Sequence, residues 1–559
     1  MTSDKKNISL LADIFVNSGL TDIVISPGSR NAPIILSFAN RSEINAFSIV
    51  DERSAAFFAL GLALNSKKTV AIACTSGSAV LNYASAISEA YYQKIPLLII
   101  TADRPPNMID IGDGQTIRQK NVFNNYVKKS YQLPLTIDTK EELEDAEKLI
   151  NEALNQCVFP QAGPVHMNIP FDDPLYNSTE EVTTGKSIEF ENKIAIPDIS
   201  KIQEIATSWN NSSKVMLIAG QASPAPELNK ILQKISENQN TVLLSETTSN
   251  LFCNNFIDTI DNLTSTINNS ETNLFKPEIL ITFGGQVVSK MIKKFLRKNK
   301  PLIHWHISPS GEKMDTYFAL TEAINSDELD FFSQIEQHLE TVNSNYSSLW
   351  HERKSKVDKK KTEYLKKTKY SDFKVFEAIV KHLPEGANLH LGNSTPVRYS
   401  QLFGSREGIN YYSNRGVSGI DGQVSTAAGY ACNSSNLNVL ITGDLGFLYD
   451  SNGLMNKYLT PNLKIIVINN SGGGIFKFIG GPDTTPNLEE FFVTKHQWSA
   501  EYICKAFGVD YLKAENDNEL SSILPKLLSN NPGPTLLEIF TPCEINGLVL
   551  REYFKFIKN

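Results

Sequence analysis

Short apolar runs alternate with helical patterns along the first third of the chain. DIVIS, INAFSIV, TVAIAC and PLLIIT each lead into a polar or glycine-containing loop, and stretches of helical period follow, such as AAFFALGLAL and AVLNYASAISEAYYQ. This alternation is typical of a parallel sheet whose strands are joined by right-handed helical crossovers. We therefore predict a doubly wound α/β domain over residues 1–180.

The last third of the chain repeats this scheme in the same order. ANLHL, INYYS, NVLIT and LKIIVIN are each followed by a polar loop, and the second of these loops leads into the helical pattern QVSTAAGYA. The matching order indicates a duplicated fold, although few residues are identical between the halves. We predict a second doubly wound domain over residues 373–559, with loops that meet those of a first domain across a shared cleft.

A third α/β unit is predicted between these two. The runs KVMLIAG, TVLLSE, ILITFGG and LIHWHIS read as strands separated by helices, over residues 188–345. No GxGxxG pattern accompanies them, so a bound dinucleotide is not expected there. The charged segment 346–372 is predicted to be a helical linker. The predicted fold class is α/β, with three doubly wound parallel-sheet domains.

Composition excludes several classes of protein. The length of 559 residues exceeds what one hydrophobic core supports, and a net charge of −8 gives no reason to expect a nucleic-acid partner. No apolar run reaches the ~20 residues that span a bilayer, and the first residues do not resemble a signal peptide, so we expect no membrane insertion and a cytoplasmic location. The six scattered cysteines fit reduced thiols.

Oxygen-bearing side chains follow two of the predicted strands in the last third. NVLIT delivers Asp444 and LKIIVIN delivers Asn470, and the carboxyl ends of parallel strands meet at one edge of a sheet. A carboxylate, an amide oxygen and the carbonyl of Gly472 are ligands that Mg²⁺ prefers. Because Mg²⁺ completes a sparse site with waters and phosphates, the pattern predicts a diphosphate-bearing ligand.

These motifs resemble those of the thiamine diphosphate enzymes. GDLGF with NNSGGGIF is similar to the family's GDG and NN signature. Leu445 stands where that signature has its second glycine, and in this the chain resembles the menaquinone-pathway synthases of the family. Further motifs occur in the order of that branch: SPGSR, DERSAAF, TSGSA, ADRP, GNS followed by Arg398, and NRGVSGIDG. The resemblance covers nearly the whole chain.

The resemblance implies the cofactor, the assembly and the site. The first and last domains would bind the pyrimidine and diphosphate ends of thiamine diphosphate, with Mg²⁺ or Mn²⁺ held by Asp444, Asn470 and Gly472. Active sites would lie at the subunit interface of a homodimer or homotetramer. The remaining cofactor contacts implied are Glu52, at the aminopyrimidine, and Ser394, Ile420, Gly473, Ile475 and Phe476. Residues implied in catalysis are Glu52, Arg30, Gln115, Arg398 and Arg415, and those implied in substrate binding are Ser29, Arg30, Arg104, Gln115, Lys290, Ser394, Arg398, Arg415 and Phe476.

The implied reaction decarboxylates 2-oxoglutarate and adds the succinyl carbanion equivalent to isochorismate in a 1,4-addition. Both substrates carry two carboxylates, which the planar fork of arginine binds bidentately. An alternative is another thiamine diphosphate-dependent 2-oxoacid decarboxylase or an acetolactate synthase-like enzyme, whose substrate methyl would not need four arginines. A non-catalytic binding module is the other alternative, and it need not retain Glu52, Asp444 and Asn470 together.

Overall fold

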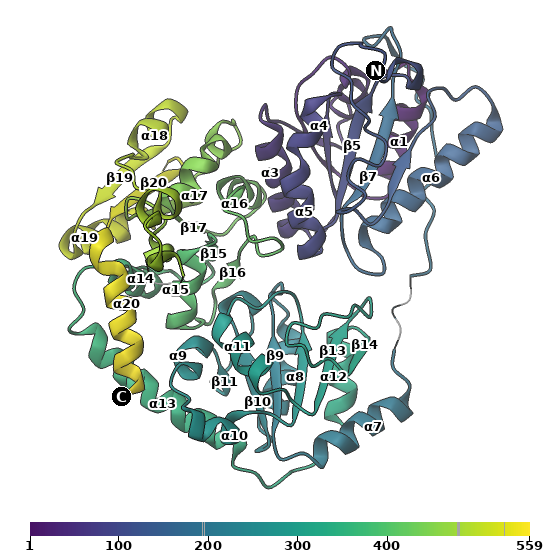
Figure 1. Ribbon diagram of the computed structural model, residues 1–559. Helices are drawn as coiled ribbons and strands as arrows, with labels where there is room; N and C mark the ends of the chain where they lie inside the picture. Colours follow the sequence, from purple (N-terminus) through teal and green to yellow (C-terminus); the bar gives the residue numbers. More distant parts are fainter. Residues whose placement is uncertain (193, 195, 478–480, 530–531) are drawn as a thin grey trace.

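Three α/β bodies make up the protein, as the computed structural model in Figure 1 shows, and each is built on a six-stranded sheet. The structure describes residues 1–192, 194, 196–477, 481–529 and 532–559. Every strand pair within the three large sheets is parallel, and the described pairs also include one short antiparallel pair, β1 with β8. The predicted fold class is therefore confirmed.

The first body contains the sheet β3-β2-β4-β5-β7-β6. Its elements are β1 (Thr2–Ser3), α1 (Lys6–Asn17), β2 (Asp22–Ile25), α2 (Ala32–Phe38), β3 (Asn45–Ser48), α3 (Glu52–Ser66), β4 (Val70–Cys74), α4 (Ser78–Asn82), α5 (Ala84–Gln93), β5 (Leu97–Asp103), β6 (Ser130–Gln132), α6 (Lys140–Val158), β7 (Val165–Pro170) and β8 (Ser178–Thr179).

The middle body contains the sheet β11-β10-β9-β12-β13-β14. Its elements are α7 (Ile199–Asn210), β9 (Val215–Ala219), α8 (Pro226–Ile235), β10 (Thr241–Ser245), β11 (Phe256–Ile257), α9 (Ile260–Thr264), α10 (Thr272–Phe275), β12 (Ile279–Phe283), α11 (Lys290–Lys298), β13 (Ile303–Ser308), β14 (Glu322–Asn325) and α12 (Glu328–Glu336).

The helix α13 (Tyr346–Leu365) runs from the middle body to the last one, along the lower left of Figure 1. The last body contains the sheet β16-β15-β17-β18-β20-β19. Its elements are α14 (Asp372–His382), β15 (Asn388–Leu391), α15 (Thr395–Phe403), β16 (Asn410–Tyr412), α16 (Gln423–Cys432), β17 (Asn438–Gly443), α17 (Asp444–Tyr449), β18 (Leu463–Asn469), α18 (Glu501–Phe507), β19 (Asp510–Ala514), α19 (Asp517–Leu527), β20 (Thr535–Phe540) and α20 (Cys543–Lys558).

The first and last sheets share one connection order. In the first sheet, β3 lies outside β2 at one edge and β6 lies outside β7 at the other. In the last sheet, β16 lies outside β15 at one edge and β19 lies outside β20 at the other. The middle sheet differs, because its chain starts at the centre with β9 and reverses direction between β9 and β12. The shared order is what a duplicated fold predicts.

Helices α3 and α16 pack the first body against the last one, and the two helices lie side by side in Figure 1. Two glycines allow this contact. A Cβ on Gly61 would lie 2.1 Å from the carbonyl oxygen of Thr426, and a Cβ on Gly429 would lie 2.0 Å from that of Phe58. The helices therefore meet backbone to backbone, which holds the two bodies in a fixed relation.

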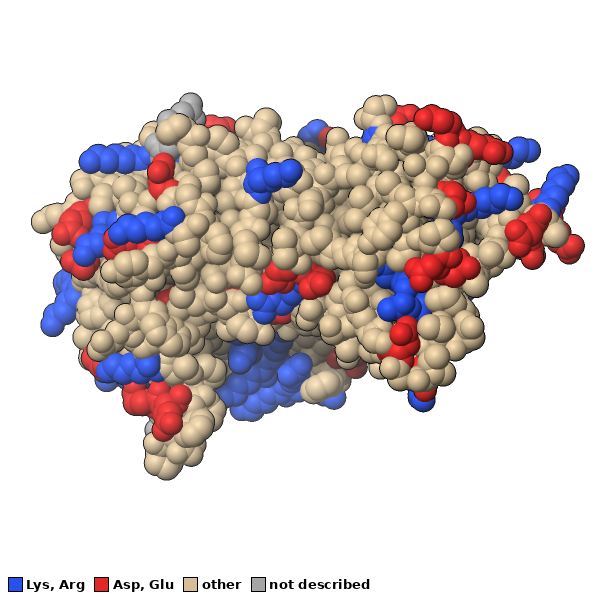
Figure 2. Space-filling view, turned by 90° about the horizontal axis from the view of Figure 1, so that it is seen from above, with Lys and Arg blue, Asp and Glu red and all other residues tan. Residues whose placement is uncertain are grey.

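Positive charge is concentrated locally although the net charge of the chain is −8. Figure 2 shows Lys and Arg side chains gathered in one hollow at the lower middle of the molecule, while Asp and Glu side chains are scattered over the same face. A local excess of positive charge attracts anionic ligands independently of the net charge. Among the described helices, none is long and apolar enough to cross a membrane.

Candidate active site

A cavity of about 440 Å³ opens at the carboxyl ends of β15, β17 and β18 in the last body. Parallel α/β sheets bind ligands at this edge. The cavity brings together many of the residues expected from the sequence: Lys290, Ser394, Arg398, Arg415, Ile420, Asp444, Asn470, Gly472, Gly473, Ile475 and Phe476. Lys290 comes from the middle body and the others come from the last body.

Asp444 and Asn470 follow neighbouring strands, because β17 pairs with β18 in parallel register. Both side chains are buried, with 3% and 5% of their surface exposed. The Asp444 carboxylate accepts hydrogen bonds from the main-chain N–H of Leu445 at Oδ1 (2.7 Å) and of Gly472 at Oδ2 (2.8 Å). Nε2 of His496 lies 3.2 Å from the same Oδ2. This carboxylate is therefore held in one orientation at the cavity wall.

Asn470 presents an acceptor without a partner. Its Nδ2 donates to Oδ2 of Asp372 (2.9 Å), whereas its Oδ1 is buried and has no hydrogen-bond partner among the described residues. Asp372 is itself fixed by a hydrogen bond from the Thr541 hydroxyl (2.6 Å) and donates its main-chain N–H to Asn546 (3.0 Å). Burial raises the pKa of Asp372 to about 6, against the hydrogen bonds from Thr541 and Asn470. An orphaned buried oxygen needs a partner such as a cation.

The turn after β18 depends on Gly472. Its φ is +142°, and a Cβ at this position would lie 2.4 Å from the carbonyl oxygen of Val493. Only glycine fits both conditions. The Gly472 carbonyl accepts one hydrogen bond, from the N–H of Gly474 (2.8 Å), which leaves its second lone pair available. A carboxylate, a free amide oxygen and this carbonyl together fit a hard divalent cation.

Two guanidinium groups lie in the same cavity. Arg415 is 7% exposed and donates from Nη1 to Oδ1 of Asn393 (2.9 Å), while the buried Nε atoms of Arg415 and Arg398 have no hydrogen-bond partner in the described parts of the chain. Burial lowers the pKa of both groups, and Arg398 lowers that of Arg415 further. Guanidinium donors without a partner in one cavity favour an anionic ligand, such as a carboxylate.

Lys290 adds a third cation at the first position of α11. The segment before it is held by the buried carboxylate of Glu246, which accepts the N–H groups of Val288 and Ser289 (both 2.6 Å). Burial raises the pKa of Glu246 to about 7, and these two hydrogen bonds oppose the shift. The middle body thus contributes an exposed lysine to the cavity, on a main-chain segment that Glu246 holds in place.

Apolar side chains line another part of the cavity. Ile475 is 8% exposed, whereas Ile420 is 38% exposed and has surface available for a ligand. The ring of Phe476 packs at 5.7 Å from that of Phe492. Ser394 adopts φ +72° ahead of α15, a conformation that costs free energy for a non-glycine residue. Strain of this kind is often found at ligand-binding sites.

The first-body residues expected at the site do not line this cavity within one chain. Glu52 begins α3, and its Oε2 accepts a hydrogen bond from Nδ2 of Asn82 (3.1 Å). Ser29 and Gln115 are exposed, and Gln115 adopts φ +59° and donates from Nε2 to the carbonyl of Ser76 (3.2 Å). These residues follow strands of the first sheet, so they occupy the corresponding edge of that sheet.

Arg30 and Arg104 also lie at this edge. Arg30 is buried, donates from Nη1 to the carbonyl of Phe171 (3.0 Å) and lies 3.6 Å from Asp173. Arg104 donates from Nη2 to the carbonyl of Gly114 (3.1 Å), and its Nε is 3.4 Å from Asp113. Burial lowers the pKa of Arg30, and the charge of Arg104 lowers it further. Both guanidinium groups therefore bind to protein groups of the first body, and the positive charge of Arg104 acts on Arg30.

Four contact residues were not singled out from the sequence: Asp372, Asn393, His496 and Glu89. Asn393 could have been found, because it belongs to GNS directly after a predicted strand. Asp372 lies at the start of a helix beside the charged linker, and His496 lies 26 residues after Asn470, so neither has a local motif. Glu89 is discussed below.

Comparisons with known proteins define the class. Residues 7–127 match "Thiamine pyrophosphate enzyme, N-terminal TPP binding domain", residues 191–391 match "Middle domain of thiamine pyrophosphate", and residues 392–539 match "Thiamine pyrophosphate enzyme, C-terminal TPP binding domain". A benzoylformate decarboxylase from Polynucleobacter necessarius has the same fold, with a TM-score of 0.71 at 18% identity, covering 96% of this chain and 99% of that one. The chain is a thiamine pyrophosphate enzyme by family.

Curated relatives narrow the family. The 2-succinyl-5-enolpyruvyl-6-hydroxy-3-cyclohexene-1-carboxylate synthase of Flavobacterium johnsoniae is 43% identical, over 98% of both chains. Proteins of the same name from Porphyromonas gingivalis and Desulfotalea psychrophila are 40% and 37% identical, over 99% and 96% of this chain and 98% of each relative. The chain belongs to the family of these synthases, which confirms the resemblance found in the sequence.

Proposed function

We propose that the protein forms 2-succinyl-5-enolpyruvyl-6-hydroxy-3-cyclohexene-1-carboxylate from 2-oxoglutarate and isochorismate, with release of CO₂, in menaquinone biosynthesis. The observation that supports this most directly is one cavity that contains Asp444, the free oxygen of Asn470 and the guanidinium groups of Arg398 and Arg415, whose Nε atoms have no hydrogen-bond partner among the described residues. One part suits a metal-bound diphosphate and the other suits a substrate with two carboxylates.

The cofactor is thiamine diphosphate with Mg²⁺ or Mn²⁺. When bound, thiamine diphosphate supplies an electron sink for decarboxylation of a 2-oxoacid. Asp444, Asn470 and the carbonyl of Gly472 would hold the metal, and Ser394, Gly473 and Ile475 would line the cofactor. Ile420 offers exposed apolar surface to the cofactor, and Glu52, at the start of α3, offers the carboxyl that would contact the aminopyrimidine ring.

Substrate recognition depends on the cations. Arg398 and Arg415 lie in a buried setting, where charge-assisted hydrogen bonds to a carboxylate are strong. Lys290 adds charge from the middle body, and Phe476 gives an apolar face for the carbon skeleton. Ser29, Arg30, Arg104 and Gln115 would complete the substrate contacts from a first body. The substrates bound by these residues would be 2-oxoglutarate and isochorismate.

We place the complete site between two chains, in a homodimer or homotetramer. Within one chain the described residues that line the cavity come from the middle and last bodies alone, while Ser29 and Gln115 lie exposed on the first body. A second copy could bring that surface over the cavity. The cytoplasm is the proposed location, and the free thiols of all six cysteines fit it.

The test uses purified protein with thiamine diphosphate and Mg²⁺. We expect CO₂ release and adduct formation with 2-oxoglutarate and isochorismate together, and no acetolactate or acetaldehyde with pyruvate. Turnover of pyruvate alone would overturn the proposal and favour an acetolactate synthase-like or decarboxylase activity. Absence of turnover with every 2-oxoacid, while the cofactor still binds, would favour a non-catalytic module.

A further inference from the structure

The segment 413–420 carries two residues of the cavity, Arg415 and Ile420, and has no regular secondary structure. The last body holds it through Asn393, whose Nδ2 donates to the carbonyls of Asn414 (2.5 Å) and Gly419 (2.7 Å). Oδ1 of Asn393 accepts from Arg415. A segment without its own ladder of hydrogen bonds depends on such side chains for its position.

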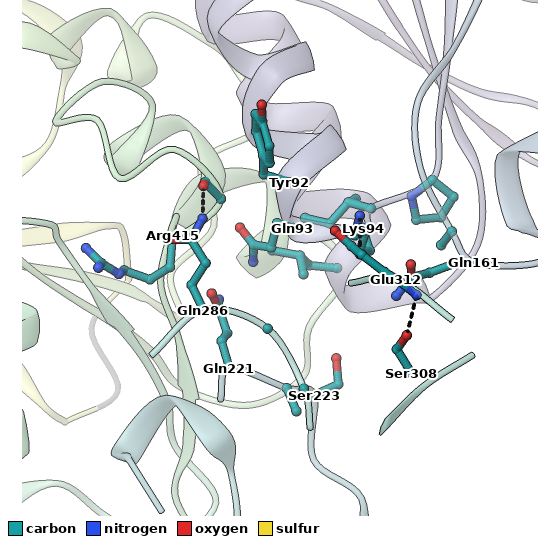
Figure 3. A pocket seen from close by; sticks show the side chains of 18 of the residues that line it. Tyr92, Gln93, Lys94, Gln161, Gln221, Ser223, Gln286, Ser308, Glu312 and Arg415 are labelled. Atoms are coloured by element: carbon teal, nitrogen blue, oxygen red, sulfur yellow. Dashed lines mark hydrogen bonds and ion pairs between the residues drawn. The ribbon is translucent and has the colours of Figure 1, made fainter. Parts of the chain in front are cut away.

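The middle body holds the same segment from the other side. Nε2 of Gln221 donates to the carbonyl of Ser413 (2.7 Å), and Nε2 of Gln286 donates to the carbonyl of Gly416. Figure 3 shows both glutamines beside Arg415 in a second cavity, of about 530 Å³, at the junction of the three bodies. Arg415 lines this cavity and the active-site cavity, so the segment is a thin wall between the two.

The first body contributes a carboxylate. Glu89 lies on α5 and is 1% exposed, and it accepts the main-chain N–H groups of Gly416 at Oε1 (2.5 Å) and Val417 at Oε2 (2.8 Å). The helix and the segment approach closely, since a Cβ on Gly416 would lie 2.4 Å from the Glu89 carbonyl oxygen. The two carboxylate oxygens of Glu89 therefore accept hydrogen bonds from the two residues that follow Arg415.

Burial of the Glu89 carboxylate carries a desolvation cost, because within the described parts of the chain it is held by main-chain N–H groups and not by an ion pair. That desolvation raises the pKa of Glu89 to about 6, while the N–H groups of Val417 and Gly416 and the charge of Arg415 lower it. An apolar residue would fill this place without the desolvation cost. What the carboxylate provides instead is the pair of hydrogen bonds to the segment.

We infer that Glu89 is a positioning residue for the reaction: its two hydrogen bonds fix the segment 413–420, so that the Arg415 guanidinium and Ile420 stay in the active-site cavity. The inference rests on the proposed function for its kinetic consequence. It makes the first body of each chain a determinant of substrate binding in that same chain's last body. The proposed metal ligands Asp444 and Asn470 belong to other segments, and the hydrogen bonds of the Glu89 carboxylate go to Gly416 and Val417.

The test is the variant Glu89→Gln, which keeps the shape but offers one acceptor oxygen and turns an N–H₂ toward the other N–H. We expect a tenfold or larger rise in KM for the dicarboxylate substrates and a smaller rise in the Kd for thiamine diphosphate, because Ile420 belongs to the segment whereas Asp444, Asn470 and Gly472 do not. Glu89→Asp keeps both carboxylate oxygens on a shorter side chain, so its KM should lie between that of the wild type and that of Glu89→Gln. Glu144→Gln, an exposed carboxylate on α6, is the matched control.

Hydrogen exchange provides a readout that needs no substrate. In Glu89→Gln we expect at least tenfold faster exchange of the amides in 413–420, with unchanged exchange in 463–470. Equal exchange in 413–420, or a uniform acceleration throughout the last body, would overturn the inference. Because this measurement does not depend on the identity of the substrates, it decides the role of Glu89 even where the kinetic assay contradicts the proposed function.

Discussion

Asn470 donates a hydrogen bond from Nδ2 to Oδ2 of Asp372 (2.9 Å), and this contact determines which end of the amide is left for a ligand. An ionised carboxylate accepts hydrogen bonds only, so it selects the amide nitrogen and leaves Oδ1 free. The Thr541 hydroxyl, at 2.6 Å, holds the other oxygen of Asp372. Asp372, which also lines the cavity, thus orients a proposed metal ligand.

Removing this carboxylate should weaken metal binding. In Asp372→Ala the amide of Asn470 can rotate, because its nitrogen has lost its acceptor. Loss of such a supporting contact typically lowers metal affinity by about 10- to 100-fold. Calorimetric titration of Mg²⁺ in the presence of thiamine diphosphate measures the effect, with Asp358→Ala on α13 as the control. Equal affinity in Asp372→Ala and wild type would contradict this role.

The sequence was sufficient for the three sheets, because their strands are buried on both faces and read as continuous apolar runs. All five residues of β4 and all seven of β18 are buried. It was also sufficient to place Asp444 beside Asn470, since residues that end adjacent parallel strands must be neighbours. These inferences need only local patterns and the geometry of a sheet.

Other features could not be predicted, because they depend on contacts between distant segments. Glu89 occurs in ASAISEAYYQ as an ordinary polar position of a helix, and only the packing of α5 against the segment 413–420 gives it a role. Asp372 and His496 likewise reach the site from a helix start and from a loop. The separation of Glu52 from the cavity within one chain is also a property of the packed bodies.

The guanidinium of Arg398 should matter through its geometry as well as its charge. Its buried Nε has no partner in the described ranges, and a lysine at this place would keep the charge but lose the planar fork. We expect Arg398→Lys to raise KM for the dicarboxylate substrates about tenfold, and Arg398→Ala to raise it further. Steady-state kinetics measures both, with the exposed Arg118→Lys as the control. Equal KM values for Arg398→Lys and wild type would show that charge alone suffices.

Buried His166 should make the stability of the first body depend on pH. Its ring nitrogens contact the hydroxyls of Thr101 (2.8 Å) and Ser130 (3.3 Å), and burial lowers its pKa to about 3 from 6.5. The unfolded chain therefore binds a proton below pH 6.5 that the folded chain does not, so stability is complete above pH 6.5 and falls as the pH decreases.

The variant His166→Gln has no such titration, so its deficit relative to wild type should shrink as the pH falls. Between pH 7 and pH 5 the difference in the free energy of unfolding between the two proteins should change by about 2 kcal/mol, because the contribution of His166 falls by about 1.4 kcal/mol per pH unit below 6.5. Differential scanning calorimetry of both proteins across this range measures it, and His382→Gln on the exposed end of α14 controls for effects unrelated to burial. A constant difference would contradict a buried neutral His166.

Two inactive variants should restore activity when they are mixed, if each site combines Glu52 of one chain with Asp444 of another. Glu52→Gln should bind the cofactor but lose nearly all turnover, and Asp444→Ala should lose metal and cofactor affinity. In a mixed dimer, one of the two sites receives both native residues. With random assortment about half of the dimers are mixed, so activity should return to about a quarter of the wild-type value.

Dissociation and reassociation of the two variants, followed by the standard assay and light scattering for oligomeric state, measures this recovery. Each variant reassociated with itself is the control. No recovery in verified mixed dimers would place Glu52 and Asp444 in the site of one and the same chain.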